Sequence, residues 1–118
     1  MYTLEITASA ERDLDEITDY VGNTLFNPTA ALAILDEFDR VSETLEDSPE
    51  IFPLCSDGKL AELGYRKAIV RAYILVFEIV EPAQVVRVLR IFHESENYSQ
   101  KLDGSGCGQQ WNDNEELP

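Results

Sequence analysis

Side chains that could hold a charged oxygen and move a proton are concentrated in the second half of the sequence. Arginine and lysine supply fixed positive charge, whereas histidine and tyrosine can transfer a proton to or from a reacting group. The residues with these properties are Arg66, Lys67, Arg71, Arg87, Arg90, His93 and Tyr98. Cleavage of a phosphodiester without a metal needs such groups, and we take Arg66, Arg90, His93 and Tyr98 as the candidate catalytic residues.

The alternation of side chains along a β-strand predicts which of these groups can meet. In a strand over residues 85–92, Arg87 and His93 would lie on one face of the sheet and Arg90 on the other. In the strand over residues 65–71, Arg66 and Lys67 would point to opposite faces. A small basic patch on one face is therefore possible, but it would not contain every candidate.

A structural role is the alternative for the same residues. The aliphatic stems of Arg66 and Arg90 could pack on the sheet while their charged heads pair with carboxylates. The carboxylates considered for this role are Glu62, Glu78 and Glu94. His93, the one histidine of the chain, could likewise be a hydrogen-bonded structural residue. The sequence leaves both readings open.

Other catalytic chemistries lack the residues that they need. The sequence has no glycine-rich phosphate loop and no cluster of metal ligands around its histidine, so it predicts neither a metal nor a cofactor. Cys55 and Cys107 do not form a CxxC pair, and we expect both to be free thiols.

Charge divides the chain into unlike parts. The net charge is −14, and residues 1–50 carry 13 acids against Arg12 and Arg40. Residues 51–102 carry six acids and seven bases, whereas residues 103–118 carry four acids and no base. An acidic half next to a nearly neutral one suggests two surfaces with different partners, although a solvated helical face would give the same pattern.

Hydrophobic periodicity predicts a strand followed by two helices. Residues 2–7 alternate between apolar and polar, as in a half-buried strand. Residues of an apolar stripe then recur at helical spacing, first at Ala10, Leu14, Ile17, Val21 and Leu25, and later at Ala31, Leu35, Phe38, Val41 or Ser42, and Leu45. Thr7 or Ser9 is expected to cap the first helix, and Asn27 with Pro28 to start the second, which ends near Glu46.

Three strands are expected in the rest of the chain, over residues 65–71, 73–80 and 85–92. A connection over residues 50–64 precedes them, with one helical turn near residues 60–63. The links between these strands are short enough only for antiparallel hairpins. The sequence thus predicts an α+β fold of order β-α-α-β-β-β, with a helical hairpin on one face of a mostly antiparallel, up-and-down four-stranded sheet. We expect the other face to be free for a partner chain.

A single domain is expected over residues 1–102, followed by a flexible acidic tail over residues 103–118. A short helix is expected near residues 94–102. The sequence has no apolar run of the roughly 20 residues that cross a bilayer and no secretory signal at its start, which predicts a cytoplasmic protein that does not contact a membrane.

Several short motifs, in this order, resemble the RelE/ParE superfamily of bacterial toxins. Residues 10–17 with Tyr20 resemble the first helix of that superfamily, and residues 27–31 the start of its second helix. Residues 64–67, with Val70 and Tyr73, resemble the entry to its three-stranded meander. Residues 89–93 and Tyr98 resemble its closing segment, so that the likeness extends from residue 1 to about residue 102.

This resemblance implies that the chain is the toxin of a type II toxin–antitoxin module, neutralised by a cognate antitoxin. RelE-like members cleave messenger RNA on the ribosome, which would give the four candidate residues a catalytic role without any cofactor. ParE-like members poison DNA gyrase. Glu94 and Glu96 stand where the family commonly has cationic residues, which also suits a relative that binds but does not cleave. By charge, we expect an antitoxin segment rich in lysine and arginine.

Overall fold

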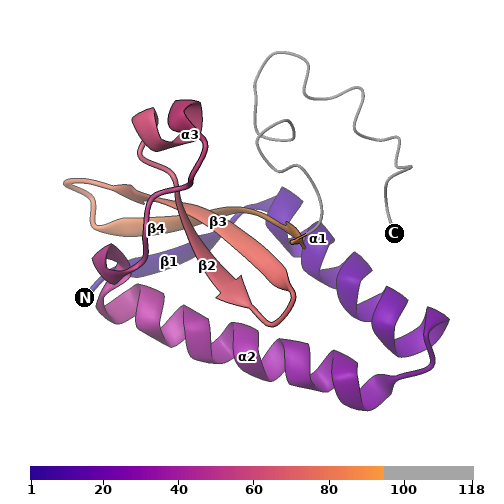
Figure 1. Cartoon of the computed structure of the whole chain (residues 1–118). Helices are drawn as coiled ribbons and strands as arrows, with labels where there is room; N and C mark the ends of the chain where they lie inside the picture. The colour runs from indigo at the N-terminus through magenta and orange to yellow at the C-terminus, as the bar shows by residue number, and fades with distance from the viewer. Residues whose placement is uncertain (95–118) are drawn as a thin grey trace.

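The computed structural model describes residues 1–94 of the chain, and residues 95–118 are drawn as a grey trace (Figure 1). Tyr98, Cys107, the helix expected near residues 94–102 and the expected domain boundary at residue 102 fall wholly or partly outside the described residues. The elements are β1 (Thr3–Ile6), α1 (Ala8–Asp19), the π-helical turn η1 (Tyr20–Thr24), α2 (Pro28–Asp47), the 3-10 turn η2 (Pro49–Ile51), α3 (Gly58–Glu62), β2 (Arg66–Val70), β3 (Tyr73–Val80) and β4 (Val85–His93).

The predicted order of helices and strands is confirmed, and so are the two helix starts. The Thr7 hydroxyl accepts a hydrogen bond from the Ala10 amide at 3.1 Å, and the Asn27 side chain accepts one from the Ala30 amide at 3.1 Å. Both caps satisfy amides that have no partner within the helix. They fix where each arm of the helical hairpin begins.

The four strands form one sheet in the order β1-β4-β3-β2. β2–β3 and β3–β4 are antiparallel, as the short links require, but β1 runs parallel to β4. The expectation of an up-and-down sheet was therefore wrong for β1. Loop length restricts direction only between strands joined by a short turn, and the helical hairpin and two strands separate β1 from β4 along the chain.

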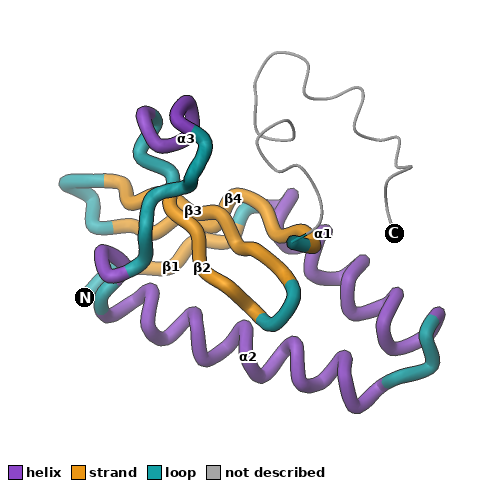
Figure 2. Tube along the Cα trace, viewed as in Figure 1, coloured by secondary structure: helices purple, strands orange, loops and turns teal. Residues whose placement is uncertain are grey.

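The main core lies between the helical hairpin and one face of the sheet (Figures 1 and 2). From α2 it takes Ile34, Phe38, Val41 and Leu45, and Leu35, expected in this set, is instead 36% exposed. Leu25 was also expected inside but is 52% exposed. The π-helical turn η1 inserts extra backbone before Leu25, which rotates the following residues away from the buried side of α1.

A second, smaller core covers part of the opposite face of the sheet. It is formed by Cys55, Leu60, Val76 and Phe92, and the segment that includes α3 supplies the first two. Burial raises the pKa of the Cys55 thiol, which is free. The face expected to be open is therefore partly occupied by residues 55–60, and the surfaces left for partners lie at its margins.

Tyr2 connects the start of the chain to two distant segments. Its hydroxyl donates a hydrogen bond to Glu50 at 2.7 Å and lies 3.2 Å from a carboxylate oxygen of Glu81. The hydrogen bond to Glu50 is the main reason that the pKa of Tyr2 rises from 10.0 to about 12, and burial and Glu81 add to the rise.

This shift predicts a loss of stability at alkaline pH. Because the pKa of Tyr2 is higher in the folded chain, its contribution to the free energy of unfolding is complete below pH 10 and disappears between pH 10 and about 12. The free energies of unfolding of the wild type and of Tyr2→Phe, measured with urea, should differ below pH 10 and become equal as the pH rises to about 12. The two proteins losing stability in parallel from pH 10 upward would contradict the assignment.

Candidate functional site

An irregularity in β4 decides which way its charged residues face. Val76 pairs with Arg90 and Phe77 pairs with Val88, so that Leu89 is an extra residue in the ladder. Arg87 pairs with Glu78, which places Arg87 and Arg90 on the same face of the sheet, with Val76. The prediction that Arg87 shares a face with His93 was wrong, because simple alternation does not allow for a bulge.

Arg90 is held by a carboxylate from α1. Its Nε lies 2.7 Å from Asp13 Oδ2 and its Nη2 lies 3.0 Å from Oδ1, a two-point contact of the kind that guanidinium and carboxylate form best. Asp13 Oδ2 also accepts a hydrogen bond from the Ile91 amide at 2.9 Å. The side chain of Arg90 is only 19% exposed and that of Asp13 only 12%. Asp13 thus continues the hydrogen bonding of β4 beyond the end of β1.

Arg66 is bound to the backbone of the preceding connection. Its Nη1 donates to the Phe52 carbonyl at 2.6 Å and reaches the Glu50 carbonyl at 3.4 Å. Arg66 pairs with Phe77 in the sheet and so lies on the helix-covered face, whereas Arg90 pairs with Val76 and lies on the opposite face. Glu78, which the sequence offered as a partner for Arg66 or Arg90, forms its ion pair with Arg87 instead, at 2.9 Å.

His93 lies at the end of β4, opposite Tyr73, and the two rings meet edge to face with centroids 5.4 Å apart. This pairing puts His93 on the helix-covered face with Arg66, but His93 is level with Tyr73 and Arg66 with Phe77, four positions further along β3 and on the strand at the other side of it. The described part of the chain therefore does not bring Arg66, Arg90 and His93 to one point. Their catalytic role, with that of Tyr98, stays a prediction.

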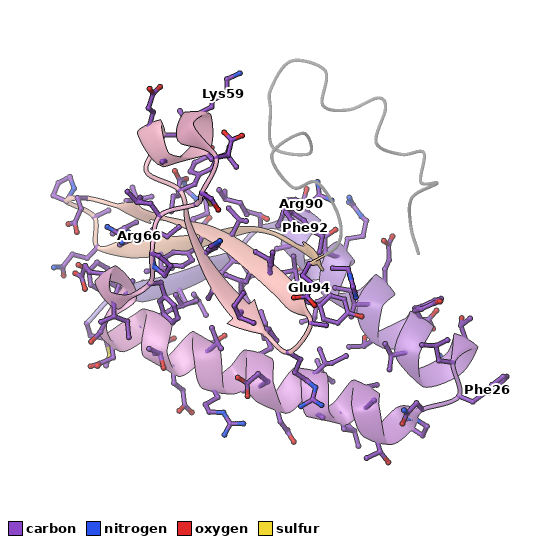
Figure 3. All side chains as sticks on the ribbon, in the orientation of Figure 1. Phe26, Lys59, Arg66, Arg90, Phe92 and Glu94 are labelled. Carbon is purple, nitrogen blue, oxygen red and sulfur yellow. The ribbon has the colours of Figure 1, made fainter. Side chains whose placement is uncertain are left out.

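An exposed apolar surface at the end of the helical hairpin was not predicted from the sequence. This apolar tip consists of Tyr20, Leu25, Phe26 and Leu32, which are 45%, 52%, 85% and 62% exposed. Phe26 has a φ of 54°, a left-handed backbone that is uncommon for a large side chain, and it points away from the body of the molecule (Figure 3). No signal in the sequence indicated this surface, because Leu25 fits the helical stripe of α1 and only the π-helical turn η1 takes it off that stripe.

Acidic residues continue this surface along the exposed side of α2. Asp36, Asp39 and Glu43 are all exposed and follow the apolar tip toward the carboxyl end of the helix. A ligand that covers both parts must have apolar side chains at one end and positive charge at the other. The surface is suited to an amphipathic protein segment.

Comparison with models of protein families identifies the family of this chain. The family model described as the ParE toxin of the type II toxin–antitoxin system, parDE, matches residues 4–98. The chain belongs to the ParE toxin family. The match takes in α1, α2 and the whole meander of this ParE-family chain, and it confirms the RelE/ParE resemblance.

Two solved structures resemble the ParE-family chain. The chromosomal ParDE toxin–antitoxin system from P. aeruginosa gives a TM-score of 0.63 at 21% identity, covering 79% of this chain and 96% of that one. The RelBE2 toxin–antitoxin complex from Mycobacterium tuberculosis gives a TM-score of 0.52 at 25% identity, covering 78% and 96%. At this identity the ParDE match supports the fold alone. Comparison with curated proteins gave no match.

The ParE-family chain has no helix, among residues 1–94, with the length and apolar character needed to cross a membrane. In the same residues no group of histidine, cysteine and carboxylate side chains gathers in a way that could hold a metal ion.

Proposed function

We propose that this ParE-family chain is a toxin that acts by binding proteins, with DNA gyrase as its target and a cognate antitoxin as its inhibitor. The observation that carries the proposal is the apolar tip, in which Phe26 is 85% exposed on a strained backbone. Such a residue lowers the stability of the free chain and contributes nothing to its core, which is the expected property of a residue kept for a partner.

The positions of the arginines support binding over RNA cleavage. Arg90 is neutralised by Asp13 and Arg66 is directed to backbone carbonyls, so neither guanidinium is free to stabilise a phosphorane. Cleavage would require both to leave hydrogen bonds that hold the fold. Endoribonuclease activity on translated messages, through Arg66, Arg90, His93 and Tyr98, is the competing function that the experiment below tests.

The antitoxin is expected to carry an amphipathic, basic segment. Its apolar side chains cover the apolar tip, and its lysines and arginines lie over Asp36, Asp39 and Glu43 on α2. The product of a neighbouring small open reading frame is the natural candidate, and it should restore growth when co-expressed.

Inducible expression in a bacterial host separates the possible activities. We expect growth arrest with induction of the DNA-damage response, and the purified chain should inhibit supercoiling of relaxed plasmid by gyrase. Primer extension on translated messages should show no new cuts. Cuts in messages with normal DNA topology would replace gyrase inhibition by RNA cleavage, and normal growth throughout would leave a binding relative without toxicity.

A further inference from the structure

A groove of about 450 Å³ lies between α2 and β2. Its apolar walls come from Val41 on α2, from residues 51–53 of the connection, and from Ala68 and Ile69 on β2. Ile51 and Ile69 are 68% and 53% exposed, so the groove opens to solvent through apolar side chains. This site is separate from the apolar tip, which lies beyond the other end of α2.

The backbone of β2 is open along this groove. β2 is an edge strand, and only its first half is covered, by a bridge from Leu54 to Arg66 and a hydrogen bond from the Lys67 amide to the Pro53 carbonyl at 3.1 Å. The backbone N–H and C=O groups of Lys67 point away from β3, and because this direction repeats every second residue along a strand, those of Ile69 also point away from β3. Within residues 1–94 the backbone of Ile69 has no partner outside the sheet, and an extended chain could pair with it.

Two basic side chains without a carboxylate partner among residues 1–94 lie beside the open part of the edge, and the Glu37 carboxylate that also lines the groove is paired with Arg40 at 2.9 Å. Lys67 donates to the Ser56 hydroxyl at 3.3 Å and has no carboxylate partner among the described residues, and the same part of the chain offers none to Arg71, which is exposed in the β2–β3 turn. In a chain of net charge −14, these two unneutralised cations mark the edge of β2 as a site for an acidic segment.

The chain contains a segment with matching properties. Residues 103–118 carry four acids, no base, and the apolar residues Trp111 and Leu117. The route to the groove is short, because the Glu94 amide bonds to the Ala72 carbonyl at 2.9 Å, which puts the end of the described chain at the β2–β3 turn. An extended connection of residues 95–110 spans up to about 50 Å, whereas two strand spacings are about 10 Å.

We propose that residues 103–118 bind in extended form along the free edge of β2. The carboxylates of this segment pair with Lys67 and Arg71, and Trp111 enters the apolar groove between α2 and β2. Because the segment is tethered beside its site, a weak intrinsic affinity is sufficient for occupancy. The bound segment covers an edge that would otherwise pair with other chains.

The single tryptophan of the chain allows a direct test. In the full-length protein, we expect the emission of Trp111 to be shifted to the blue, and acrylamide to quench it about twofold less than in a free peptide of residues 103–118, because the ring is shielded. Lys67→Glu should return both properties toward those of the free peptide. Arg12→Glu, an equal change of charge on α1, should leave them unchanged.

A second variant tests the backbone pairing. Ile69→Pro removes the outward amide without removing a bond to β3, and it should also release Trp111. Circular dichroism establishes whether this variant folds. If it does not fold, Lys67→Glu alone decides the outcome. Emission of the full chain equal to that of the free peptide would overturn the proposal. So would a blue shift that Lys67→Glu leaves intact, or one that vanishes on dilution and therefore arises between copies.

Discussion

Replacing Asp13 with alanine should lower the free energy of unfolding by about 3 kcal/mol, because it removes the two-point contact between a mostly buried carboxylate and a mostly buried arginine. Asp13 accepts two hydrogen bonds from Arg90 and one from the Ile91 amide, and both side chains are largely removed from solvent. The substitution removes all three of these hydrogen bonds. Urea unfolding followed by circular dichroism measures the effect.

Glu16→Ala provides the matched control, since Glu16 is an exposed acid on the same helix. We expect it to change stability by less than about 0.5 kcal/mol. A double-mutant cycle with Arg90→Ala should show strong coupling between Asp13 and Arg90. A loss for Asp13→Ala as small as that of Glu16→Ala would mean that the contact contributes nothing. Any loss of toxicity in Arg90→Ala must first be corrected for lost folded protein.

Replacing Phe26 with glycine should separate binding from stability. The side chain is 85% exposed and its φ of 54° favours glycine, so the free energy of unfolding should stay constant or rise by up to about 1 kcal/mol. Affinity for the antitoxin, measured by calorimetry with the purified product of the neighbouring gene, should fall at least about tenfold, as for a central aromatic contact.

Two further variants define the extent of this surface. Leu32→Asp, at the residue of the apolar tip that lies on α2, should weaken antitoxin binding by a comparable factor. Leu63→Asp makes the same change at a residue that is 57% exposed beside α3, outside the apolar tip, and should bind as the wild type does. Equal affinities for all three variants would exclude the apolar tip as the antitoxin site.

The sequence was sufficient to predict the elements and the family, because each depended on local signals. The Asn27-Pro28 start of α2 and the apolar runs of β3 and β4 act through neighbouring residues. The direction of β1 and the bulge at Leu89 depend on contacts between distant segments, and no local pattern encodes them. The bulge reversed the predicted relation between Arg87 and His93.

The site was less predictable for the same reason. Asp13 and Arg90 are 77 residues apart, and no local pattern connects an aspartate of the first helix with an arginine of the last strand. The alternative structural role of Arg90 was expected in kind, but its partner comes from α1. Phe26 was not singled out, since a single aromatic residue between two helices has no periodic pattern to which its exposure can be compared.

The parallel pairing of β1 with β4 has a consequence for the order of events during synthesis. The partner of Thr3 is Val85, so the sheet is incomplete until the last strand has left the ribosome. At about 5–20 residues per second, that delay amounts to roughly 4–17 s after β1 is made. The helical hairpin is translated well before then, and a waiting antitoxin can meet it on the nascent chain before an active toxin exists.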